Sequence, residues 1–276
     1  MSTKIEWATE TWNPVTGCTK ISEGCQNCYA KRMANRLRGR YGYPADEPFR
    51  VTFHRDRIEQ PLKWKKPRKI FVCSMGDLFH SGLTGWMINN VWLVIRNAPQ
   101  HIFILLTKRP GAMKAWTDAA AQVKAWPVEE IWPENAWLGV TAENQKCADE
   151  RIPILLQIPA AVRFVSVEPM LGPVDLRHMD VEEYSHEWCF IDALTGKHTD
   201  MGRPCPAVPK LDWVICGGET GPGARPMKKE WVHDLRDQCV DAGVPFFFKK
   251  WGPGGRRDID GEMWEQWPAQ KPKQQL

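Results

Sequence analysis

The chain is organised around the stretch Cys18-Thr19-Lys20-Ile21-Ser22-Glu23-Gly24-Cys25-Gln26-Asn27-Cys28, which places three thiols within eleven residues. The two gaps differ in length, as C-x6-C-x2-C, so the backbone can loop once and bring three sulfurs to one side. Three thiolates can bind three irons of a four-iron, four-sulfur (4Fe-4S) cluster. The fourth iron then stays open to a substrate or cofactor, so the spacing predicts such a cluster on Cys18, Cys25 and Cys28.

Two other interpretations of the same cysteines stay open. Structural zinc normally takes four protein ligands. No Cys or His precedes Cys18, and none follows Cys28 until His54, so a zinc ion would need a distant fourth ligand. The remaining alternative is that the three thiols are buried without any metal.

Length and composition indicate a soluble protein, which we predict to be a single domain over residues 1–276. Hydrophobic residues make up 43% and charged residues 25%, enough for a sizeable core and an ordinary polar surface. Residues 1–10 contain Lys4, Glu6 and Glu10 and lack the apolar region of a signal peptide. No apolar run approaches the length of a membrane span. We therefore expect a reducing, cytoplasmic compartment, in which the nine cysteines are free or metal-bound rather than in disulfides.

Short apolar segments alternate with amphipathic ones along the chain. Strands are predicted at 4–16, 69–75, 101–107, 136–141, 162–167, 211–216 and 244–248. Helices are predicted at 29–38, 86–97, 112–126, 145–157 and 228–242. This alternation is typical of parallel strands covered by helices. Because no Gly-rich dinucleotide fingerprint follows the first strand, we expect a partial or full (β/α) barrel rather than a Rossmann fold.

Three segments depart from that alternation. Residues 172–210 form a Pro-containing insertion before the penultimate strand, and residues 254–276 form a polar tail. The insertion carries zinc-ligand types, so it is either a second metal site or a plain lid or loop; these residues are His186, Cys189, His198 and Cys205. Residues 39–69 are rich in Lys and Arg, which fits a solvated face or a phosphate-binding surface equally well.

Polar side chains follow nearly every predicted strand, where parallel α/β folds gather their reactive groups. Individually these residues have plain explanations: Asp77 could cap the next helix, and Lys108 and Arg109 could lie in a solvated turn before Pro110. Their repetition across the strand ends favours one shared mouth that also contains the cysteines.

The chain resembles the phage-encoded three-cysteine-motif family (DUF5131), which is assigned to the radical S-adenosylmethionine superfamily. The resemblance covers nearly the whole chain. It is carried by residues 12–18, 24–30, 75–80, 105–110, 137–140, 166–169, 217–226 and 246–252, which include Gly217-Gly218-Glu219-Thr220-Gly221-Pro222-Gly223-Ala224-Arg225-Pro226. One departure is the first cysteine gap, which is six residues here and three in the commonest superfamily motif.

The resemblance implies a partial barrel in which Cys18, Cys25 and Cys28 bind a 4Fe-4S cluster and the open iron binds S-adenosylmethionine. An external electron donor would reduce the cluster, and the cofactor would be cleaved to methionine and a 5′-deoxyadenosyl radical that abstracts a substrate hydrogen. By strand-end position and charge we assign cofactor-binding roles to Asp77 for the amino group, to Lys108 or Arg109 for the carboxylate, and to Glu143 or Glu168 for the ribose hydroxyls.

The substrate is not defined by the sequence. A phage family and the basic residues between 31 and 69 are compatible with nucleic-acid modification or repair. Two competing functions remain: a non-catalytic zinc or nucleic-acid-binding protein with Cys73 or His80 as the fourth ligand, and an ordinary barrel hydrolase or transferase with structural cysteines.

Overall fold

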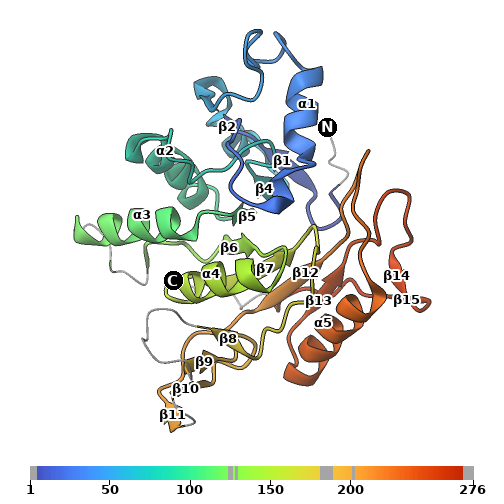
Figure 1. The fold of residues 1–276 in the computed structure, drawn as a ribbon. Helices are drawn as coiled ribbons and strands as arrows, with labels where there is room; N and C mark the ends of the chain where they lie inside the picture. Colours follow the sequence, from blue (N-terminus) through green and yellow to red (C-terminus); the bar gives the residue numbers. More distant parts are fainter. Residues whose placement is uncertain (1–4, 124–126, 128–129, 181–188, 201–202, 270–276) are drawn as a thin grey trace.

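A seven-stranded parallel sheet forms the centre of the molecule in this computed structural model, which describes residues 5–123, 127, 130–180, 189–200 and 203–269. The strand order is β1 (Glu10–Trp12), β4 (Lys69–Val72), β5 (Ile102–Thr107), β6 (Ala136–Thr141), β7 (Val162–Val167), β12 (Trp213–Cys216) and β13 (Phe246–Phe248). The sheet curls into a half-barrel with β1 and β13 at its edges (Figure 1). The predicted partial barrel of parallel strands is confirmed.

Helices lie in the connections between successive strands of the central sheet, as the alternation predicted, except between β7 and β12, where the insertion lies. They are α1 (Tyr29–Arg36), α2 (Gly85–Arg96), α3 (Pro110–Gln122), α4 (Gln145–Leu156) and α5 (Lys229–Ala242). Short 3-10 turns lie at η1 (Glu23–Cys25), η2 (Arg55–Arg57) and η3 (Pro61–Lys63). The predicted end of the third helix at Trp126 lies outside the described residues. In the described part of the chain, no helix has the length and apolar character needed to cross a membrane.

The first strand is shorter than predicted. Only Glu10–Trp12 pairs with β4, whereas β2 (Val15–Thr16) turns away and pairs antiparallel with β3 (Thr52–Phe53). The intervening Pro14 has no backbone N–H to donate to a ladder, which explains why the pairing with β4 ends there. The turn away sends the chain into the cysteine stretch.

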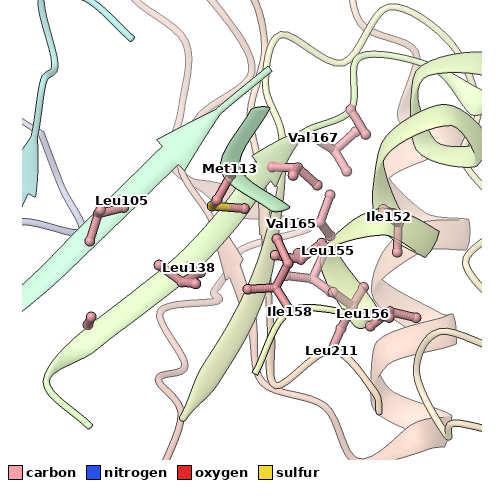
Figure 2. Packing of buried hydrophobic residues seen from close by; sticks show 14 of the residues in the cluster. Leu105, Met113, Leu138, Ile152, Leu155, Leu156, Ile158, Val165, Val167 and Leu211 are labelled. Atoms are coloured by element: carbon pink, nitrogen blue, oxygen red, sulfur yellow. The ribbon is translucent and has the colours of Figure 1, made fainter. Parts of the chain in front are cut away.

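The convex face of the sheet packs against the helices. Figure 2 shows Leu138 and Val165 of neighbouring strands lying toward Leu155 of α4, with Met113 of α3 close by. These side chains are almost fully buried. Each such burial contributes about 1.5–3 kcal/mol of transfer free energy, so this layer is a main source of stability.

The concave face is filled by aromatic rings at the amino ends of the strands. Trp137, Phe164, Trp213 and Phe247 belong to one buried cluster, and the Trp213 ring stacks on Trp267 with centroids 4.9 Å apart. The Phe164 ring lies directly against Gly139, where any Cβ would overlap it. The half-barrel is therefore plugged at this end, and its open space lies toward the carboxyl ends of the strands.

The insertion before the penultimate strand is a separate antiparallel sheet. Its order is β11 (Arg203–Cys205), β10 (His198–Asp200), β9 (Cys189–Ile191) and β8 (Met179–Asp180). In Figure 1 it lies at the opposite end of the molecule from α1. It therefore does not cover the cysteine stretch that precedes α1.

Much of the predicted polar tail is folded. β14 (Asp258–Ile259) and β15 (Glu262–Met263) form a hairpin. The chain then runs along the edge strand β13, where the Phe248 N–H donates to the Trp264 carbonyl at 2.7 Å. The Gln, Lys and Pro content of this segment led to its prediction as a polar tail. Trp264 and Trp267 nevertheless pack against the core and hold the segment there.

Candidate metal centre

The three predicted cysteines line one cavity of about 270 Å³ at the carboxyl ends of the strands. Cys18 and Cys25 lie in the loop between β2 and α1, and Cys28 directly precedes the first residue of α1. All three thiols are free and partly exposed. Among the described residues, no three His, Cys, Asp or Glu side chains gather closely enough to hold a single metal ion. A 4Fe-4S cluster takes one thiolate on each of three irons, so three thiols that line one cavity are compatible with such a cluster.

The thiols differ in how readily they ionise. Burial would raise the pKa of Cys25, but the Lys108 ammonium and hydrogen bonds within the loop outweigh it and lower the pKa below its ordinary value. Burial and the Asp77 carboxylate raise the pKa of Cys18 to about 11, against a smaller lowering by Arg109. A metal bound through these sulfurs would have to displace the Cys18 proton, whereas Cys25 ionises more readily.

Glu143, just after β6, anchors one side of the cysteine loop. Its carboxylate is fully buried and accepts from the Lys108 ammonium, the Ser22 hydroxyl and, at 2.7 Å, Arg151 Nη1. Burial raises the pKa of Glu143, but the two cations more than offset it and hold the pKa at about 2. Gly24 lies against this carboxylate, where a Cβ would overlap it. Glu143 therefore holds the loop and does not line the cavity.

Glu219, after β12, anchors the other side. Its carboxylate accepts from Arg225 Nη2 at 2.5 Å, from Arg225 Nε at 2.9 Å and from Asn27 Nδ2 at 2.9 Å. Arg225 Nη2 also donates to the Glu23 carbonyl at 3.1 Å. The hydrogen bonds from Arg225 are the main reason that the pKa of Glu219 is lowered to about 2. Glu219 and Arg225 together hold the segment between Cys25 and Cys28 through Asn27 and the Glu23 carbonyl.

The start of the loop is held at Thr19. Arg109 Nη2 donates to the Thr19 hydroxyl at 2.8 Å, and His80 Nε2 lies 2.9 Å from the same oxygen. Arg109 Nη1 is buried and, within the described residues, has no hydrogen-bond partner. Arg109 thus contacts the loop and does not line the mouth cavity.

Two acidic side chains besides Glu219 line the cavity. Asp77 is buried and accepts from the Thr107 hydroxyl at 2.8 Å and from the Phe79 N–H at 2.9 Å, so it caps the turn that follows β4. Glu168, after β7, accepts from Lys249 Nζ at 2.5 Å. Burial would lower the pKa of Lys249, but neighbouring carboxylates, chiefly Glu168, raise it overall, so Lys249 stays charged beside Glu168.

The structure thus separates the predicted cofactor-binding residues into two groups. Asp77, Lys108 and Glu168 line the cavity with the three cysteines, whereas Arg109 and Glu143 do not. Sequence reasoning missed the anchoring roles of Ser22, Asn27, Arg151 and Arg225. Of these, Arg225 stands in the Gly217–Pro226 motif beside Glu219, which was the one available signal.

The suggested zinc ligands outside the loop have other partners. Cys73 lines the cavity, and burial raises its pKa far above the ordinary value. His80 contacts Thr19, and its Nδ1 accepts from the Gly82 N–H at 2.9 Å. In the insertion, Cys189 Sγ lies 3.2 Å from His198 Nε2, while Cys205 is paired with His198 across the strands. The fourth suggested ligand there, His186, lies outside the described residues.

Comparison with known proteins identifies a family but no characterised relative. The family described as "Protein of unknown function (DUF5131)" matches residues 2–268. Searches of curated proteins and of solved structures give no match.

Proposed function

The chain belongs to the DUF5131 family, and from its three-thiol mouth we propose that it is a radical S-adenosylmethionine enzyme with a 4Fe-4S cluster on Cys18, Cys25 and Cys28. The observation that carries the proposal is the shared cavity, in which three thiols face open space at the carboxyl ends of parallel strands. When bound, the cluster supplies the electron from an external donor that cleaves S-adenosylmethionine to methionine and a 5′-deoxyadenosyl radical.

The protein's own part is to hold the loop and to offer charges to the cofactor. Asp77 and Lys108 give the zwitterionic end of S-adenosylmethionine one acidic and one basic neighbour in the cavity. Glu168 faces the same cavity with Lys249 behind it, which suits hydrogen bonds from ribose hydroxyls better than the fully buried Glu143 does. Arg109 and Glu143 act as positioning residues for the loop rather than as cofactor ligands.

Water exclusion follows from the aromatic plug. Trp137 and Phe164 fill the concave face at the amino ends of the strands. The cavity is therefore closed toward the amino ends and open toward the mouth at the carboxyl ends. A radical formed there would meet a substrate that enters from the mouth, shielded from solvent on the plugged side.

The test is anaerobic purification of the full chain, with counts of iron and sulfide, followed by reduction with added S-adenosylmethionine. We expect a brown protein with about four irons per chain, a reduced-cluster spectrum that changes when the cofactor is added, and slow formation of 5′-deoxyadenosine without substrate. A colourless protein with one stoichiometric zinc would establish the zinc-binding alternative instead. An iron–sulfur protein whose spectrum ignores the cofactor would overturn the enzymatic part.

A further inference from the structure

A second cavity, of about 440 Å³, lies against the same three thiols on the side of α1. Its wall includes Lys20 from the cysteine loop and the side chains Lys31, Asn35 and Arg38. The last three recur at the spacing i, i+4, i+7, so they form one stripe along α1 and the turn that follows it. The cysteine loop thus has the cofactor mouth on one side and a hollow with three cations on the other.

The charge of this second cavity is positive after its ion pairs are counted. Neither Lys20 nor Lys31 has an ion-pair partner among the described residues, and both are exposed. Arg38 donates through Nη1 to the backbone carbonyls of residues 45 and 46 and keeps its charge. Of the two acidic residues in the wall, Asp46 is paired with Arg50 at 2.9 Å, which leaves Glu47 as the one opposing charge there.

The positive charge of the chain is concentrated in one segment, which contributes Lys31 and Arg38 to this cavity. Residues 31–69 contain thirteen Lys or Arg and four Asp or Glu, although the chain as a whole carries only +4. The rest of the molecule is therefore net negative. Such an uneven distribution along the chain favours contact of a polyanion with this segment.

Two exposed tyrosines flank the cationic stripe of α1 in the sequence. Tyr29, the first residue of α1, is 58% exposed and stands at the rim of the mouth cavity. Tyr41 is 73% exposed in the loop after α1, where its carbonyl accepts a hydrogen bond from Arg57. Cationic grooves with exposed aromatic rings are the usual means of binding single-stranded nucleic acid, because every base has a face that can stack.

We propose that the α1 cavity binds the phosphate backbone of single-stranded nucleic acid and that bases stack on Tyr29 and Tyr41. Since Tyr29 borders the mouth and the two cavities share the three cysteines, a bound strand would be led from the cationic hollow past the cysteine loop to the cofactor cavity. The proposal names the substrate class for the proposed radical enzyme and in that sense rests on it. Binding of the strand itself requires only the cations and rings, so it can be measured without any turnover.

The experiment is fluorescence anisotropy of a labelled single-stranded 12-mer with the full chain, with and without cluster, over a series of salt concentrations. The test variant is the double change Lys20→Gln, Lys31→Gln. Its matched control is Lys146→Gln, Lys210→Gln, which removes the same charge from exposed sites outside the cavity. For single strands each lost phosphate contact lowers the slope of log K against log salt by about 0.7. We therefore expect a slope reduced by about 1.4 and at least tenfold weaker binding for the test variant, with the control unchanged.

Stacking is tested separately with Tyr29→Leu against Tyr29→Phe. The first removes the ring and should weaken binding by roughly 5- to 150-fold, whereas the second keeps a stacking face and should bind like the parent. A duplex of the same sequence should bind more weakly than the single strand, because its bases are not free to stack on the tyrosines.

Equal weakening in the test and control variants, or no binding at low salt, would overturn the proposal while leaving the radical chemistry untouched. If the test variant kept strand binding but was reduced more slowly by an acidic electron-transfer protein, the cavity would belong to the electron donor, and the proposal would equally fail. Conversely, salt-dependent binding by a protein that forms no 5′-deoxyadenosine would support the strand site and refute the enzyme.

Discussion

Two regions of this molecule are rich in thiols, and they differ in how their sulfurs are held. The cysteine loop is fixed by charged side chains that follow β5, β6 and β12, and its three thiols share one cavity. In the insertion, Cys189 is paired with Asp200 and Cys205 with His198, on the two strands that flank β10. The backbones at Cys189 and Cys205 are therefore two strand spacings apart, about 10 Å, and also out of register. Zinc holds its sulfurs at about 2.3 Å, so ligand types in one segment do not make a site unless the backbone brings them together.

The largest expected effect is on the cysteine loop itself. Changing Cys18, Cys25 or Cys28 to Ala should remove most of the iron. Each thiolate is the protein's one ligand to its iron, so the iron that loses its cysteine would be exposed to solvent and the cluster would be lost. Iron counts after anaerobic reconstitution measure this. The matched control is Cys239→Ala, which lies in α5 away from the mouth and should keep its iron. Cys147, which the sequence also suggested as a control, contacts the anchor Glu143 and is not a neutral site. Full iron in Cys18→Ala would refute the assignment.

The next effect concerns Glu143, the buried carboxylate that anchors the cysteine loop and has no counterpart described in the insertion. Glu143→Ala leaves Lys108 and Arg151 without their shared carboxylate and should destabilise the protein by about 3–5 kcal/mol, as for other broken buried ion pairs. It should also lower iron retention, since Ser22 loses its partner. The measurement is urea unfolding together with iron content. Glu150→Ala removes an exposed pair with Lys146 on the same helix and should cost under about 1 kcal/mol. Equal effects in the two variants would show that Glu143 is not an anchor.

A smaller effect should appear with acid. The pKa of Glu219 is lowered to about 2 in the folded protein from 4.5, mainly by hydrogen bonds from Arg225. A carboxylate with a depressed folded pKa adds stability above its unfolded pKa, and that contribution is lost as pH falls from 4.5 toward 2. Glu219→Gln should therefore be less stable at neutral pH yet lose less stability between pH 5 and pH 3. Urea midpoints at both pH values test this, and an unchanged acid dependence in Glu219→Gln would contradict it.

The smallest effect is expected in the insertion. The double change Cys189→Ser, Cys205→Ser should leave the metal content of the protein unchanged, because the strand pairing keeps the two sulfurs apart. Metal analysis of parent and variant, prepared side by side, is sufficient. A loss of one zinc per chain in the variant would show that Cys189 and Cys205 do bind a metal, as the cysteine loop is proposed to do.

Sequence patterns predicted the architecture well because a parallel α/β fold repeats one signal. Every apolar segment between residues 69 and 248 became a strand of the central sheet, and each amphipathic segment became a helix. The first strand was predicted too long because its alternating Trp residues gave no sign of where pairing ends. The tail was predicted as polar because two tryptophans count for little in an average over 23 residues.

The site was less predictable, because strand-end position says where a side chain lies and not what it contacts. Glu143 and Glu168 looked equivalent in sequence, yet one is enclosed by two cations and the other faces the cavity. The difference comes from Arg151, on the helix after Glu143, and from Gly24, which allows the loop to approach. Such partners are set by packing in three dimensions and have no local pattern.

The anchors of the cysteine loop also impose an order on how the protein can mature. The contact between Asn27 and Glu219 joins residues 192 positions apart, so during synthesis the loop leaves the ribosome long before its last anchor exists. Until Arg225 emerges and folds back, one flank of the loop is unsupported and its three thiols are open to oxidation. On the proposed function, insertion of the cluster would have to wait until the chain is nearly complete. A truncated product that ends before residue 219 would expose the cysteines without forming the anchored loop.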